Sequence, residues 1–246
     1  NPIAAPLAVM RSSLMGSLID ILKHNLARRV GRVRLFETGR VFMRDATQRD
    51  GELDVAGVRQ PRRVAGLAYG AADALQWGTK ERASDFFDIK GDVEALLAPR
   101  RACFVPCEHP ALHPGRAALI ELDGREIGVL GELHPRWRQA YELPQAPLLF
   151  ELDLDAVLER PLPEPRSVPK QPAAQRDLAL VVGDAVTHEA LLQSISAAAE
   201  PVVRDAQLFD VYRPKDGGER SLAVRLTLQD DAATLTDERI EQAIQA

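Results

Sequence analysis

The sequence predicts an α+β protein in which amphipathic helices and antiparallel strands form two modules. Stretches in which apolar and polar residues alternate with a period of two indicate strands. Two of the turns between strands, Asp123-Gly124 and Gly217-Gly218, have the residues that hairpins require. Apolar residues at helical spacing indicate helices that each bury one side. Residues 160–172 contain five prolines, which interrupt both helices and sheets, so this stretch is the predicted connector between the modules.

The composition excludes several classes of protein. The chain has 246 residues, of which 46% are hydrophobic and 27% charged, as in soluble globular proteins. No apolar run approaches the roughly 20 residues that span a bilayer, and the N-terminal residues lack the basic region of a secretory signal. Two cysteines are too few for a disulfide framework, so a cytoplasmic location is expected. Because the sequence begins with Asn1, we expect a fragment of a longer chain.

The first module is expected to begin with a helix over residues 13–29. Its candidate N-caps are Ser12 and Ser13, and its apolar stripe comprises Leu14, Leu18, Ile21, Leu22 and Leu26. Residues 33–42 read as two strands with a tight turn at Gly39, followed by a polar loop over 44–60. The remaining expected elements are a strand at 63–69, a helix at 85–97, a short strand at 103–107, a turn at Pro114-Gly115, a hairpin of residues 117–122 and 126–133, a helix at 135–141 and a strand at 148–154.

The second module has a shorter and more regular pattern. Strands are expected at 176–182, 202–212 and 221–229, with helices at 187–199, capped by Thr187, and from Thr236 onward. The resulting order β-α-β-β-α is that of a ferredoxin-like fold without its last strand. Because the sequence stops at Ala246, we expect that strand to be missing, which would leave the edge of the first strand exposed.

The predicted hairpin at residues 208–228 is the candidate binding site of this module. Leu208, Asp210 and Tyr212 are expected on one face of its first strand. Cationic side chains lie near the aromatic ring of Tyr212: Arg213, Lys215, Arg220 and Arg225. Proteins hold unpaired nucleotides in this way, since bases stack on rings and phosphates meet cations. The alternative is an ordinary exposed hairpin with solvated charges.

The charge distribution limits any contact with nucleic acid. Residues 1–166 hold 23 basic and 23 acidic side chains, whereas residues 167–246 hold 8 basic and 13 acidic ones, a net charge of −5. An acidic module argues against a broad phosphate-binding surface. We therefore expect a small contact directed at bases.

Seven stretches in a consistent order resemble one known family. They are MRSSL at 10–14, RLFETGRVF at 34–42, FDIKGDVEALL at 87–97, HPGRA at 113–117, GVLGELHP at 128–135, RDLALVV at 176–182 and LFDVY at 208–212. Together they resemble the C-terminal half of the beta-subunit family of bacterial phenylalanine–tRNA ligase. The resemblance extends across essentially the whole chain.

The resemblance implies three parts and a partner. Residues 1–160 would be a class II synthetase-like antiparallel sheet domain, 161–172 a proline-rich linker, and 173–246 a ferredoxin-like anticodon-binding domain. The family enzyme is an α2β2 heterotetramer that uses ATP and Mg²⁺ to charge tRNA(Phe), with its active site on the alpha subunit. No cofactor is expected on this fragment, and neither a membrane nor DNA is an expected partner.

The first module is expected to be catalytically silent. A working class II site places an arginine and a carboxylate of an R-x-[ED] strand around ATP. Here Arg34 and Glu37 are separated by one residue too many, so alternation puts them on opposite faces. No G-x-G-x-x-R motif precedes residue 160. By analogy, the helix at 13–29 and the strands at 34–42 would contact the alpha subunit.

Other active sites are less well supported by the sequence. Four potential metal ligands lie close together: Cys103, Cys107, His109 and His113. Their spacing is unusual for a zinc site and prolines bracket the histidines, so we expect no metal. No G-x-S-x-G elbow occurs, which argues against a serine hydrolase.

The resemblance makes Tyr212 the platform on which an anticodon base would stack. Asp210 would accept hydrogen bonds from a guanine edge, and Ser221 would donate to a base or phosphate. Phosphates would be reached by Arg213, Lys215 and Arg220. For Arg176, an RNA contact and an ion pair with Asp177 remain equal alternatives. The competing function for the whole chain is a protein-interaction scaffold that does not contact RNA.

Overall fold

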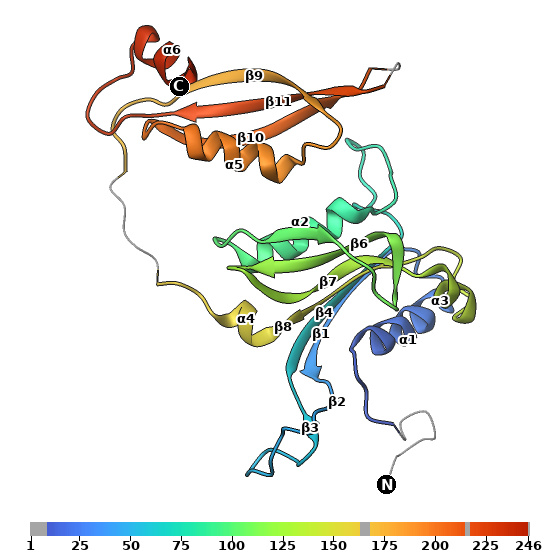
Figure 1. The fold of residues 1–246 in the computed structure, drawn as a ribbon. Coiled ribbons are helices and arrows are strands. Elements are labelled where there is room, and N and C mark those ends of the chain that lie inside the picture. Colours follow the sequence, from blue (N-terminus) through green and yellow to red (C-terminus); the bar gives the residue numbers. More distant parts are fainter. Residues whose placement is uncertain (1–8, 163–167, 215–216, 246) are drawn as a thin grey trace. The chain divides into compact units, whose positions relative to one another are not determined.

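The computed structural model describes residues 9–162, 168–214 and 217–245 (Figure 1). The chain divides into two compact units, Asn1–Pro161 and Leu162–Ala246. None of the described helices is both long enough and apolar enough to span a membrane.

The first unit is built on a six-stranded antiparallel sheet with the order β1-β4-β8-β7-β6-β5. Its strands are β1 (Val33–Arg40), β4 (Arg62–Tyr69), β5 (Cys103–Pro106), β6 (Leu112–Leu122), β7 (Arg125–Leu133) and β8 (Leu148–Asp153). Its helices are α1 (Met15–Leu26), α2 (Phe86–Leu97), α3 (Pro135–Ala140) and α4 (Leu154–Leu158). The sheet separates α1 from α2 (Figure 1).

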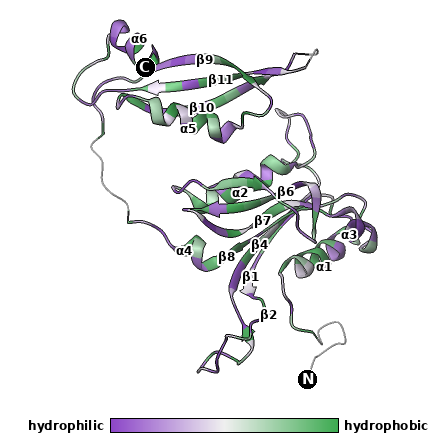
Figure 2. Cartoon of the chain, in the orientation of Figure 1, coloured by the Kyte–Doolittle hydropathy of each residue, from purple (hydrophilic) through white to green (hydrophobic). Residues whose placement is uncertain are grey.

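Alternation along the central strands gives this unit two cores. On β4, Leu67 packs with α1 residues in one buried cluster, while Val64 and Ala68 pack with α2 residues in the other. Residues on a strand alternate between faces, so both faces of this sheet must be apolar. The segment between β2 (Met43–Arg44) and β3 (Val58–Arg59) lies outside these cores and is coloured mainly hydrophilic, with some apolar residues, in Figure 2.

Several predicted details of the first unit are wrong. Gly39 is not a turn, because β1 runs through it and pairs it with Arg63 of β4. A Cβ at Gly39 would lie 2.3 Å from the guanidinium of Arg11, so the glycine leaves room for that side chain. Likewise Pro114-Gly115 lies within β6, where an irregularity in the pairing with β7 falls between Leu112 and Ala117.

The start of α1 also differs from the prediction. The N-cap is Leu14, and Ser13 Oγ accepts a hydrogen bond from the Met15 amide (3.1 Å). Ile21 was expected in the apolar stripe but is 49% exposed, whereas Met15 and Ile19 are buried. The buried stripe is therefore rotated toward the other side of the helix, where the sheet lies.

The Asp123-Gly124 hairpin is confirmed. Both residues have positive φ, 52° and 74°, as a two-residue turn of this kind needs. The turn joins β6 to β7, which pair from Leu122 with Arg125 onward. The two strands of this hairpin could therefore be predicted from neighbouring residues alone.

The second unit is a three-stranded antiparallel sheet with the order β10-β11-β9 and two helices. Its elements are β9 (Ala174–Gly183), α5 (His188–Ala198), β10 (Val203–Tyr212), β11 (Glu219–Leu228) and α6 (Asp237–Gln245). The predicted β-α-β-β-α order is confirmed, and Thr187 caps α5 by accepting from the Ala190 amide (3.1 Å).

Only one face of this sheet is covered by the helices. Buried Leu222, Val224 and Leu226 of β11 form one cluster with Leu191 of α5 and Ile240 of α6. The alternate residues of β11 point to the other face, which we call the outer face. Figure 2 shows the mixed apolar and hydrophilic colouring of these strands.

Candidate RNA-binding surface

A β-bulge in β10 decides which residues reach the outer face. Leu208 pairs with buried Val224, and the next pair is Asp210 with Ala223, so Phe209 is an extra residue without a cross-strand partner. Beyond the bulge, Val211 pairs with buried Leu222. The prediction that Leu208 shares a face with Asp210 is therefore wrong, since the bulge shifts the alternation by one residue.

The outer face brings together three of the predicted RNA-binding residues. Tyr212 pairs directly with Ser221, and Asp210 pairs with Ala223 on the same side of the sheet. Directly paired residues lie about 4.5–5.5 Å apart at Cβ. Tyr212 is 64% exposed, so its ring is accessible for stacking.

Small and apolar residues of β9 extend this surface. Val181 pairs with Ser221 and is 66% exposed, and Ala179 pairs with Ala223. The uncharged side chains of Ala179, Val181 and Ala223 next to a tyrosine and a carboxylate suit a nucleobase better than a phosphate. Asp210 Oδ1 accepts from the Val211 amide (2.9 Å), and a carboxylate has further lone pairs with which to accept from a base.

The predicted phosphate-binding cations have partners within the protein. Arg213 lies 3.3 Å from Asp184, an exposed pair that contributes little to stability. The Arg220 guanidinium donates to the Val186 carbonyl. In the sheet register, Arg220 is opposite Val182 and on the same strand face as Leu222, so its side chain projects from the helix-covered face. Lys215 lies outside the described residues.

Arg176 is separated from the other predicted residues. It pairs with buried Leu226, which places it on the helix-covered face. Its guanidinium contacts Asp237 of α6 at 3.1 Å. The ion pair expected with Asp177 does not form, because Asp177 points to the outer face and pairs with Arg225 there.

A stack of three side chains on the outer face was not predicted. Arg225 donates two hydrogen bonds to Asp177 (2.7 and 2.8 Å), and its guanidinium carbon lies 4.9 Å from the centroid of the Phe209 ring. The hydrogen bonds from Arg225 hold the pKa of Asp177 below its usual value. Phe209 was missed because simple alternation does not reveal a bulge.

In the first unit, Arg34 and Glu37 lie on opposite faces of β1, as predicted. The Arg34 guanidinium pairs with Asp92 of α2, on one side of the sheet. Glu37 pairs with Arg11, which precedes α1 on the other side. This separation does not fit a site in which both side chains would surround one ATP molecule.

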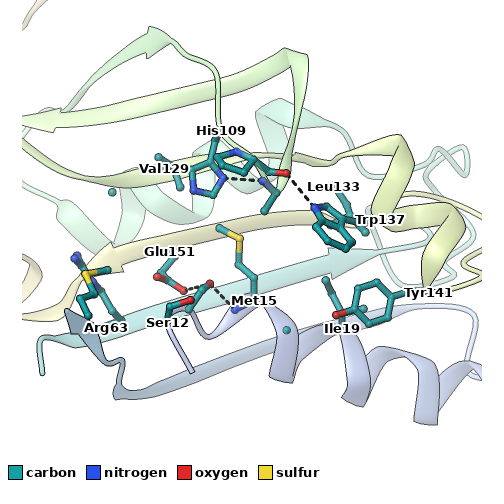
Figure 3. A pocket seen from close by; sticks show the side chains of 16 residues that line it. Ser12, Met15, Ile19, Arg63, His109, Val129, Leu133, Trp137, Tyr141 and Glu151 are labelled. Atoms are coloured by element: carbon teal, nitrogen blue, oxygen red, sulfur yellow. Dashed lines mark hydrogen bonds between the residues drawn. The ribbon is translucent and has the colours of Figure 1, made fainter. Parts of the chain in front are cut away.

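A cavity of about 710 Å³ lies on the α1 side of this sheet (Figure 3). In Figure 3, Arg63 lies at one end and the aromatic residues Trp137 and Tyr141 at the other. Glu151 Oε2 accepts from Ser13 Oγ (2.8 Å) and from the Leu14 amide (2.7 Å). This carboxylate therefore anchors the beginning of α1.

His109 faces the same cavity from the loop after β5. Its Nδ1 accepts from the Ala111 amide at 3.2 Å. Burial lowers the pKa of His109 below 6.5, although the charge of Glu151 opposes this shift. Burial therefore favours the neutral form of the imidazole.

The four potential metal ligands form no metal-binding group in the described part of the chain. The Nδ1 atom of His113 accepts from the Gly115 amide (3.0 Å), and burial raises the pKa of the Cys107 thiol. Across residues 9–162, 168–214 and 217–245, no group of three or more His, Cys, Asp or Glu residues is placed to hold a metal ion.

Comparison with known proteins assigns the chain to a family. Residues 1–154 match the family model for the phenylalanyl tRNA synthetase beta chain CLM domain, and residues 169–246 match that for the ferredoxin-fold anticodon binding domain. The chain is 57% identical over 256 positions to the phenylalanine–tRNA ligase beta subunit of Burkholderia lata, covering 100% of this chain and 32% of the relative.

Two further relatives have the same name. The protein from Cupriavidus pinatubonensis is 54% identical, over 99% of this chain and 31% of the relative. That from Bordetella parapertussis is 51% identical, over 99% and 32%. The chain thus spans about a third of the length of these relatives. Together, these matches show that the chain belongs to the phenylalanyl-tRNA synthetase beta-chain family.

Proposed function

We propose that this chain is a non-catalytic part of phenylalanine–tRNA ligase that binds the anticodon of tRNA(Phe). The observation that carries the proposal is the grouping of Tyr212, Asp210 and Ser221 on the uncovered face of the second unit. A base stacked on Tyr212 would present its edge to Asp210, which accepts hydrogen bonds from donors such as the N1 and N2 groups of guanine. Ser221 would supply a hydroxyl to the same base.

The charges of this unit support a contact that is directed at bases. Arg213 is paired with Asp184, and Arg220 is engaged by a carbonyl. With a net charge of −5 over residues 167–246, few phosphates would be neutralised. We accordingly expect a weak dependence of RNA affinity on salt, with specificity provided by stacking and by Asp210.

The first unit would serve as a scaffold and as the contact to the alpha subunit in an α2β2 assembly. ATP and Mg²⁺ would be used by that alpha subunit, because Arg34 and Glu37 of this chain lie on opposite faces of β1 and cannot both face one nucleotide. The assembly would work in the cytoplasm. The proposed parts are residues 1–160, the linker 161–172 and the anticodon-binding domain 173–246.

The absence of catalysis in this unit has a direct test. Phenylalanine-dependent exchange between ATP and pyrophosphate reports amino-acid activation, and we expect none from this chain alone. The intact ligase is the positive control. Exchange above background with the purified chain would refute the proposed silent role.

Replacing Tyr212 tests the RNA contact. Tyr212→Ala should weaken binding of the tRNA(Phe) anticodon stem-loop by about 1–3 kcal/mol, the usual loss when a stacking ring is removed. Tyr212→Phe retains the ring and should bind nearly as well as the unchanged chain. Fluorescence anisotropy with labelled stem-loop measures both.

The second candidate function is a protein-interaction scaffold without RNA contact. It is favoured by the acidic charge of the unit and by exposed Val181 on the outer face. In that case the stem-loop would bind weakly, and Tyr212→Ala would leave its affinity unchanged. That result would reject anticodon binding.

A further inference from the structure

The bulge residue Phe209 has a side chain that the fold does not bury. It lies between Leu208, which joins the core cluster, and Asp210, which faces outward. Phe209 is 49% exposed. Leaving this much aromatic surface in water costs free energy that burial would recover. An exposed aromatic ring next to a candidate binding surface therefore needs an explanation.

One side of the ring is fixed by charged neighbours. The Arg225 guanidinium lies 4.9 Å from the ring centroid, within cation–π range. Arg225 is in turn held by two hydrogen bonds to Asp177 on the neighbouring strand. Because Asp177 holds the guanidinium in place against the Phe209 ring, the ring has a defined position before any ligand binds. Preorganisation of this kind lowers the entropic cost of binding.

The exposed part of the ring lies on the outer face, as Tyr212 does. Arg225 pairs with Gln207 of β10, two residues before Phe209, and alternates with buried Val224 and Leu226. The ring that it contacts is therefore on the same side of the sheet as Asp210. Phe209 and Tyr212 are three positions apart, which is roughly 10 Å along a strand. Rings attached at this backbone spacing suit two different bases of a strand better than a single base.

We propose that Phe209, supported by Arg225 and Asp177, is a second stacking platform that holds a different unpaired base from the one on Tyr212. The proposal rests on the proposed RNA-binding function and deepens it: the outer face would bind two nucleotides of a single-stranded loop. Arg225 beneath the ring adds a positive charge that strengthens binding of an electron-rich base and its phosphate.

The test measures binding of the tRNA(Phe) anticodon stem-loop to the full chain. Phe209→Ala should weaken binding by at least about fivefold, the lower end of the loss expected for one stacked base. Phe209→Leu keeps an apolar side chain in the bulge but removes the ring, and it should weaken binding to a similar extent. If only the alanine variant binds less tightly, the loss comes from misfolding and not from the missing ring. Phe36→Ala removes a ring that is 79% exposed on β1 of the other unit and serves as the matched control, with no expected change.

Stem-loops with one abasic position at a time separate the two platforms. The effect of Phe209→Ala should vanish on one abasic RNA, and that of Tyr212→Ala on a different one. If Tyr212→Ala weakens binding but neither Phe209 variant does, the second platform is rejected while the proposed function stands. If all three variants bind as the unchanged chain does, both are rejected. If the effects of Phe209→Ala and Tyr212→Ala on affinity vanish on the same abasic RNA, the two rings contact one base, and a second platform is rejected.

Discussion

At the scale of single residues, the cavity of the first unit contains a histidine that couples folding to pH. Burial lowers the pKa of His109, and its unprotonated Nδ1 accepts from the Ala111 amide. The unfolded chain binds this proton more readily than the folded one. Stability should therefore be full above the ordinary pKa of 6.5 and decline as pH falls through the lower, folded value.

We predict that His109→Asn flattens this pH dependence. The amide oxygen of asparagine can occupy the place of Nδ1 and accept the same hydrogen bond without titrating. Urea unfolding between pH 7.5 and 5 would measure the change. His24→Gln, which removes an exposed histidine from α1, is the matched control. An equally steep loss of stability in His109→Asn would show that this histidine is not responsible.

Residue types in the second unit predicted part of the candidate site. The aromatic and acidic residues of LFDVY indicated Tyr212 and Asp210, and both lie on the uncovered face with Ser221. Arg176 could not be assigned from sequence, since its partner Asp237 is 61 residues away. Phe209 could not be identified either, because a bulge depends on pairing between strands and leaves no fixed pattern in one of them.

At the scale of elements, close approach between strands makes certain glycines essential. Gly131 of β7 pairs with Ala117 of β6, and a Cβ at Gly131 would lie 2.5 Å from the Arg116 carbonyl oxygen and 2.9 Å from the Ala117 Cα. These are backbone atoms, which cannot move without disturbing the sheet. This contact lies beside the irregularity that was predicted to be a turn at Pro114-Gly115.

Gly131→Ala should therefore destabilise the first unit by about 1–3 kcal/mol, as overpacking typically does. Gly91→Ala is the matched comparison, because Gly91 lies in α2 and a Cβ there would meet no other part of the described chain within 4 Å. That substitution should stabilise the helix by about 0.5–1 kcal/mol. Chemical denaturation measures the free energy of unfolding of both variants. Equal values for the two would contradict the prediction that Gly131 is essential to strand packing.

Elements defined by local sequence were predicted more accurately than those defined by contacts. The Asp123-Gly124 hairpin and Thr187-capped α5 follow from neighbouring residues, and both are confirmed. The continuous β1 strand through Gly39 was not predicted, because its pairing with β4 and the contact from Arg11 come from distant parts of the chain. The short α4 was also missed, since its five residues follow β8 directly.

At the scale of the whole molecule, the chain consists of two units with separate cores. The first has buried clusters on both faces of its sheet, whereas the second has one cluster and one uncovered face. The division at Asn1–Pro161 and Leu162–Ala246 supports a role as a scaffold joined to a binding domain. The linker boundaries at 161–172 stay a prediction, which limited proteolysis would check.

Mapping the RNA contact on the intact chain tests anticodon recognition by the outer face most directly. Backbone amide NMR signals would be followed while the anticodon stem-loop of tRNA(Phe) is added. We predict shifts concentrated on the outer face, at Asp210, Tyr212, Ser221 and their β9 neighbours, with no comparable shift at Arg176 or along α6. Shifts confined to the helix-covered face, or none at saturating RNA, would contradict anticodon recognition by this surface.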